Sequence, residues 1–66
     1  MTENEIRSAL IAAAGTYVGA KVPAQSRGVT QVMRELGLIG PDNGLTRTGS
    51  IHAAMVRQAA EDAAFS

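Results

Sequence analysis

The chain contains no cysteine and no tryptophan, and its only aromatic residues are Tyr17 and Phe65. Without cysteine there can be no disulfide and no thiolate metal site, so we expect no bound metal and no cofactor. Glu3 and Glu5 stand where a secretory signal would carry positive charge. The longest uncharged stretch, 8–20, is too short and too rich in small residues to span a bilayer. We therefore expect a cytoplasmic protein with no membrane segment.

The length bounds the architecture. With 66 residues the chain forms a single domain, 1–66, near the lower size at which a protein folds without crosslinks. Hydrophobic residues make up 45% of the sequence, but many of them are alanines, so the buried area per residue is modest. Closely packed helices suit such a core. A second copy would add burial, and we expect a homodimer.

Three helices are predicted from caps and apolar spacing, and the first follows a capping box of Thr2 and Glu5. This helix should begin at about Glu3 and end between Gly15 and Ala20, before Pro23 interrupts the chain. Its helical spacing predicts a wide buried face made of Ile6, Leu10, Ala13, Ala14 and Tyr17, flanked by Ile11 and Val18.

The second helix is expected to begin after the N-cap Ser26, run to about Leu36, and be closed by Gly37 in the left-handed conformation. Its apolar face should consist of Val29, Val32, Met33 and Leu36. The following sequence GPDNG favours a reverse turn, after which Leu45 would pair antiparallel with Leu38 and Ile39. This pairing would make a very small β-hairpin.

Thr46 is positioned to cap a third helix, from Arg47 to about Ala64. Its buried stripe is expected to contain Ile51, Ala54, Met55 and Ala59, with Val56, Ala60 and Ala63 beside it. Met33 and Met55 should both fill the core. The predicted fold is thus mostly α: a small three-helix domain with a short β-hairpin between the second and third helices.

The second helix also has a polar face. Arg27, Thr30, Gln31 and Arg34 share one set of helical offsets. Arginine and glutamine match the hydrogen-bonding edges of guanine and adenine in a major groove, so these side chains are candidates for reading DNA. An ordinary solvated face, with Arg34 beside Glu35, is the alternative. DNA reading requires that the guanidinium groups stand clear of the fold.

Charge is segregated along the chain although the net charge is zero. Residues 21–57 hold five basic residues against Glu35 and Asp42, a net of +3; the remainder holds Arg7 against four acidic residues, a net of −3. Because phosphate neutralisation carries much of the affinity for nucleic acid, the position of the positive charge favours the second helix as the DNA-facing element.

The order of a capped helix, the sequence LGLI, the turn PDNG and the sequence GLTRTG resembles the second half of a winged helix-turn-helix domain. Residues 26–39, SRGVTQVMRELGLI, are also similar to the recognition segment of GntR-type repressors. This resemblance covers about residues 26–50 and implies a recognition helix, a shortened wing at PDNG and a return strand at GLTRTG. It implies that Ser26, Arg27, Thr30, Gln31 and Arg34 face DNA, and that Asn43 or Arg47 touches phosphate. Lys21 is a further candidate for holding phosphate.

Catalysis is the least supported class of function. His52, the only histidine, has no carboxylate within hydrogen-bond reach along its helix and is expected to be a surface residue. We expect no enzyme, and instead a small DNA-binding regulator or architectural accessory protein that contacts double-stranded DNA. The alternative is a helical adaptor or inhibitor that binds a protein partner through its alanine-rich first and third helices and binds no nucleic acid. The segment 59–65 is the candidate for self-association.

Overall fold

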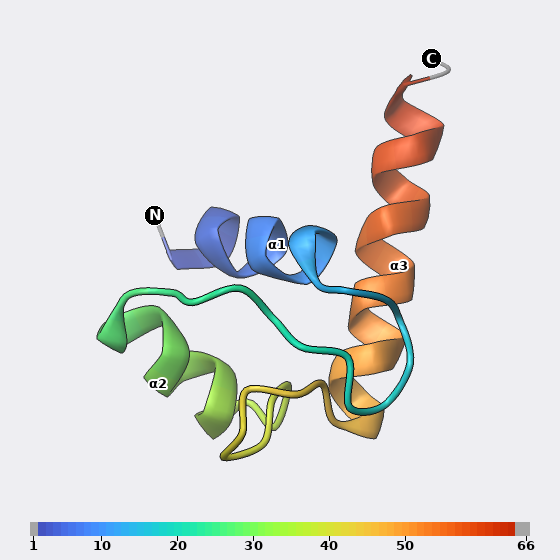
Figure 1. Cartoon of the computed structure of the whole chain (residues 1–66). Helices are drawn as coiled ribbons and strands as arrows, with labels where there is room; N and C mark the ends of the chain where they lie inside the picture. The colour runs from blue at the N-terminus through green and yellow to red at the C-terminus, as the bar shows by residue number, and fades with distance from the viewer. Residues whose placement is uncertain (1, 65–66) are drawn as a thin grey trace.

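The computed structural model describes the backbone from Thr2 to Ala64 and the side chains of residues 3–64. It contains α1 (Thr2–Ala12), α2 (Arg27–Glu35) and α3 (Arg47–Ala64). α3 crosses one end of α1, while α2 lies beside α1 on the other side of an extended segment (Figure 1). The predicted mostly helical, three-helix class is confirmed. None of the described helices combines the length and apolar character needed to cross a membrane.

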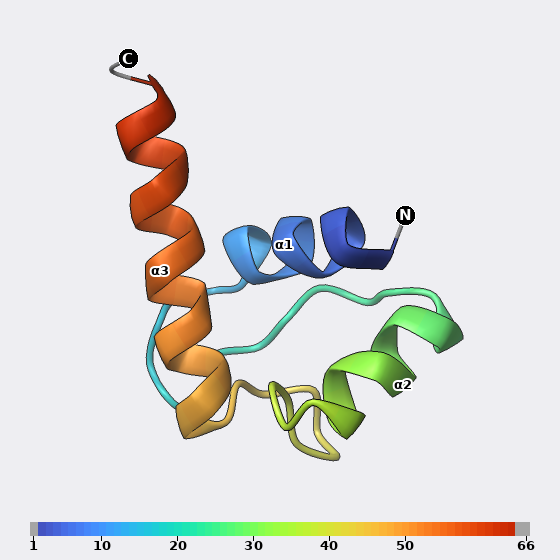
Figure 2. The same ribbon diagram turned by 180° about the vertical axis from the view of Figure 1, so that it is seen from behind.

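α1 is shorter than predicted, because it ends at Ala12 rather than between Gly15 and Ala20. The amide of Ala14 donates to the carbonyl of Lys21 at 3.0 Å, so the chain leaves the helix and folds back on itself. Residues 13–20 then pass around the side of α3 (Figures 1 and 2). Consequently Tyr17 and Val18, predicted to be buried, are 62% and 64% exposed. The capping box predicted at Thr2 lies outside the described side chains.

α2 has the caps that the sequence predicts. The hydroxyl of Ser26 accepts a hydrogen bond from the amide of Val29 at 3.4 Å. Gly37 has a φ of +74°. Its amide donates to the carbonyl of Arg34, and the amide of Leu38 donates to the carbonyl of Met33. These two bonds form a Schellman motif, which satisfies carbonyls at the end of the helix. Local sequence therefore sets both ends of α2.

The predicted β-hairpin between α2 and α3 is not confirmed. Residues 43–45 instead run between two neighbours, 38–40 on one side and 19–22 on the other, and form only isolated antiparallel bridges, Ile39 with Leu45 and Lys21 with Gly44. The backbone hydrogen bonds are Gly40 N to Gly44 O, Thr46 N to Leu38 O, Gly19 N to Leu45 O, Leu45 N to Ala20 O and Val22 N to Asn43 O. Each neighbouring segment is too short for a continuous ladder.

The core lies where α1, α2, α3 and these bridged segments meet. Met33 and Leu45 are its largest fully buried side chains. The other buried apolar residues are Ala9, Leu10, Ala13, Ala20, Val22, Val29, Leu38, Ile39 and Ala53. Four of the eleven are alanines, so the modest burial expected from the composition is found in the described part of the chain.

α3 has the predicted bounds and the predicted cap, but a different face is buried. The amide of Gly49 donates to the hydroxyl of Thr46 at 3.0 Å, and that hydroxyl in turn donates to the carbonyl of Gly37. Gly49 and Ala53 are buried, whereas Ile51 and Met55 are 54% and 63% exposed, so their predicted burial is wrong. A Cβ on Gly49 would lie 1.8 Å from the carbonyl oxygen of Leu38. Only the face of α3 that carries small residues, Gly49 and Ala53, can pack this closely against Leu38.

Candidate nucleic-acid interface

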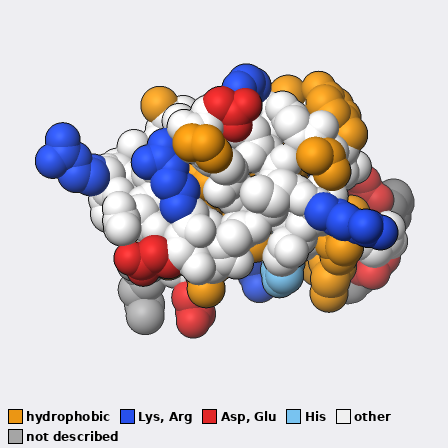
Figure 3. Space-filling model, turned by 90° about the horizontal axis from the view of Figure 1, so that it is seen from below, with side chains coloured by type: hydrophobic (Ala, Val, Ile, Leu, Met, Phe, Trp, Pro, Cys, Tyr) orange, Lys and Arg blue, Asp and Glu red, His pale blue; other side chains and the backbone are white. Residues whose placement is uncertain are grey.

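The predicted DNA-contacting residues lie on α2 and its N-cap, on the turn that follows it and at the start of α3, and Lys21 lies in the bridged segment before α2. Seen from below, lysine and arginine side chains are spread over this face of the molecule, with acidic side chains between them and toward its edges (Figure 3). The face is basic but not uniformly so. Its chemistry therefore depends on which cations are engaged within the protein and which are not.

Arg27 is a cation that no other described residue engages. It is the first residue of α2, its side chain is exposed, and it forms no hydrogen bond or ion pair with the described residues. The next residue, Gly28, is also exposed, and a Cβ added there would meet no atom within 4 Å. The first turn of α2 is therefore open to a surface approaching from solvent.

Arg34, at the other end of α2, is held by the turn. Its Nη2 donates to Oδ1 of Asn43 at 2.9 Å and to the carbonyl oxygen of Pro41 at 3.4 Å. The condition that the guanidinium groups stand clear of the fold is thus met by Arg27 and only in part by Arg34. Both acceptors are neutral, however, so Arg34 keeps its positive charge at the exposed end of the helix.

In the middle of the polar face of α2, side chains form hydrogen bonds within the helix. Nε2 of Gln31 donates to Oε1 of Glu35 at 3.0 Å, an i,i+4 pair on the helix surface. This bond brings a carboxylate next to the predicted base-reading side chains. Thr30 is half-buried, and Ser26 is used as the cap.

Lys21 is paired with the turn. Its Nζ lies 3.1 Å from Oδ2 of Asp42 and donates to the backbone oxygen of Asp42 at 2.9 Å. The amide of Gly44 donates to the same carboxylate at 3.1 Å; this bond, and then the Lys21 ammonium, lowers the pKa of Asp42 below its ordinary value. The two charges offset each other, so Lys21 adds little net positive charge to the face.

The structure brings the side chains of two of the predicted residues, Arg34 and Asn43, into direct contact, and Asn43 has a φ of +62° in the turn. Arg47 lies at the start of α3, exposed and without a partner among the described residues. The contacts of Glu35 with Gln31 and of Asp42 with Lys21 were not predicted. An i,i+4 offset from Gln31 could have indicated the first, whereas the contact of Asp42 with Lys21 is non-local.

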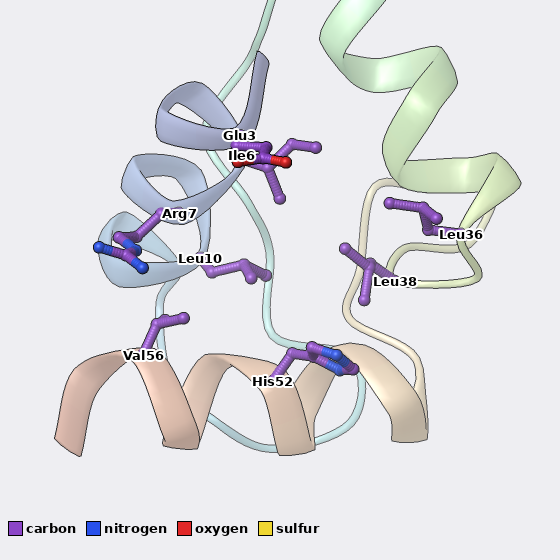
Figure 4. A pocket seen from close by; sticks show the side chains of 8 residues that line it. All are labelled: Glu3, Ile6, Arg7, Leu10, Leu36, Leu38, His52 and Val56. Carbon is purple, nitrogen blue, oxygen red and sulfur yellow. The ribbon is translucent and has the colours of Figure 1, made fainter. Parts of the chain in front are cut away.

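Sequence reasoning also missed an apolar groove of about 570 Å³. Aliphatic side chains of α1, α3 and the end of α2 point into it, and Leu36, at its edge, is 59% exposed (Figure 4). The lining residues are Glu3, Ile6, Arg7, Leu10, Leu36, Leu38, His52 and Val56. His52 is exposed, as predicted, and its Nδ1 lies 3.1 Å from the carbonyl oxygen of Thr48.

Comparisons of the chain with family models, with curated proteins and with solved structures find no match. The described residues contain no cluster of three or more histidine, cysteine or acidic side chains that could hold a metal ion.

Proposed function

We propose that this protein binds double-stranded DNA through α2 and acts as a small regulator or architectural accessory. The observation that supports this function best is the state of Arg27. It stands at the front of α2, exposed and without a partner in the described part of the chain, beside a glycine that leaves the backbone open. A flexible, uncommitted guanidinium at the tip of a helix suits contact with a guanine edge or a phosphate.

The other cations take different roles in this proposal. Arg34 contacts phosphate, because its bonds to Asn43 and Pro41 fix its position while leaving its charge unneutralised. Gln31 reads a base only by exchanging its bond to Glu35 for a base edge. Lys21 contributes little while Asp42 offsets its charge. The DNA contact is therefore expected to be of moderate strength and strongly dependent on salt.

The test is fluorescence anisotropy with a labelled random-sequence duplex over a series of salt concentrations. If Arg27 and Arg34 each displace a counterion, log K should fall with log salt with a slope of about −2. Arg27→Ala should weaken binding and make the slope shallower by about 1. Arg7→Ala is the matched control, because Arg7 is also an exposed arginine but lies on α1.

Two results would overturn this function. One is the absence of duplex binding at low salt. The other is an equal loss of affinity in Arg27→Ala and Arg7→Ala, because this would show that affinity follows total charge and not the position of α2.

A second function is favoured by the groove between α1, α3 and the end of α2. Five aliphatic side chains line it, and Leu36 at its edge is 59% exposed, so the groove presents contiguous apolar surface to solvent. In that case the protein is an interaction module that binds a protein partner and no nucleic acid. Binding of such a partner should be nearly indifferent to moderate salt and should be lost in Leu36→Asp, while Arg27→Ala leaves it unchanged.

A further inference from the structure

The outward face of α3 carries large apolar side chains that are more than half exposed. Ile51 and Met55, one helical turn apart, are 54% and 63% exposed at its centre. We call this surface the outer stripe of α3; its members are Arg47, Thr48, Ile51, Ala54, Met55, Gln58 and Asp62, all of them exposed. The opposite side of the helix, with Gly49 and Ala53, faces the core.

Opposite charges stand at the two ends of the outer stripe. Arg47 precedes Ala54 by seven residues, and Asp62 follows Met55 by seven residues, so both are equally far from the midpoint between Ala54 and Met55. At the rise of an α-helix each lies about 11 Å from that midpoint along the helix axis. Gln58 donates to Oδ1 of Asp62 at 3.1 Å, which holds the carboxylate on this face.

A surface of this kind is complementary to itself when it is turned by 180°. An antiparallel copy of α3 would bring Arg47 to Asp62 at both ends and pack Ile51 and Met55 of the two copies together in the middle. A parallel copy would instead set like charges side by side at each end. Antiparallel pairing also aligns the helix dipoles favourably. Such an isologous contact calls for no other partner.

We propose that two copies of this chain dimerise through the outer stripe of α3, in antiparallel orientation, with the two-fold axis passing between Ala54 and Met55. The inference goes beyond DNA binding, and it gives Arg47 a role in the dimer contact. Arg27, on α2, is not part of this surface, so dimerisation and DNA binding can fail separately.

Charge reversal tests the pairing directly. Sedimentation equilibrium without DNA should show a dimer of the unaltered chain, and R47E or D62R alone should raise its dissociation constant about tenfold, because two attractive contacts become repulsive. R47E combined with D62R should bring the constant back to within about threefold of the unaltered chain, because the two charges are exchanged. Circular dichroism checks that each variant keeps its helices. A chain that stays monomeric at about 1 mM, or a double variant that is no better than the single ones, overturns the proposal.

Because the chain has no cysteine, single introduced thiols test the geometry. M55C lies next to the proposed axis and should form a disulfide-linked dimer under mild oxidation, as two thiols near a two-fold axis come within bonding distance. L36C is the matched control, because Leu36 is similarly exposed at 59% but lies at the groove. Faster crosslinking of L36C than of M55C would overturn the proposal and identify the groove as the contact. R27A should leave the M55C crosslink unchanged even if DNA binding is lost.

Discussion

The two halves of α3 differ in what surrounds them. The first half, near Gly49 and Ala53, is wedged against Leu38 so closely that a single added methyl group would collide with backbone. The second half extends past α1, and every residue from 58 to 64 is exposed (Figures 1 and 2). One helix therefore plays two structural parts: the first half is fixed against the core on one side, whereas the residues at the end of the second half are all exposed.

Gly49→Ala should have the largest effect on the free energy of unfolding, because Gly49 lies in the first half of α3, which packs closely against Leu38. The new Cβ would lie 1.8 Å from the carbonyl oxygen of Leu38, so the backbone must shift. We expect a loss of about 2–4 kcal/mol, a large part of the roughly 3–10 kcal/mol that a domain of this size has. Gly28→Ala, also in the first turn of a helix, is the control and should stabilise by about 0.5–1 kcal/mol. Urea denaturation measures both, and equal effects would contradict the close approach.

Met33→Ala and Met55→Ala compare the same change inside and outside the core. Met33 is 0% exposed and Met55 is 63% exposed. The first should cost about 2–5 kcal/mol, since a cavity replaces a buried side chain, and the second should change monomer stability by no more than about 0.5 kcal/mol. Thermal unfolding at low protein concentration, where dimers are absent, checks this. A large loss for Met55→Ala would mean that the free face of α3 is covered within the subunit.

Asp42→Asn, in the turn that precedes α3, should have the smallest effect on the free energy of unfolding. The Gly44 amide and Lys21 lower the pKa of Asp42, so the folded protein binds this proton more weakly than the unfolded chain does. The stabilisation is therefore present above the ordinary carboxyl pKa of about 4 and is lost as pH falls through the lower folded value. Both side chains are well exposed, which keeps the effect small. The stability difference between the unaltered chain and Asp42→Asn should shrink on acidification; a constant difference would contradict the pairing.

The parts of the fold that depend on neighbours in sequence were predictable. Ser26, Gly37 and Thr46 act as caps because their hydrogen bonds reach only a few residues along the chain. The end of α1 was not predictable in this way, because it follows from the bond between Ala14 and Lys21, two positions that no local pattern connects.

The buried face of α3 shows a second limit. Its sequence holds two overlapping stripes, one with Ile51 and Met55 and one with Gly49 and Ala53, and hydrophobicity alone favours the first. The structure buries the second, since close approach to Leu38 requires a small face. For the candidate site, the exposure of Arg27 was foreseeable from the helical offsets, but the capture of Arg34 by Asn43 depends on the path of the turn.

The hydrogen bonds between residues 19–22 and residues 43–45 close a loop of the chain, and this loop contains all of α2. Closing a loop costs chain entropy before the closure brings any contact, whereas α2 and its turn involve only near neighbours. We therefore expect α2 to form early in folding and the bonds that close the loop to form later. Opening these bonds would free the amides that form them, so the amide hydrogens of Gly19, Val22 and Leu45 should exchange with solvent at one common rate.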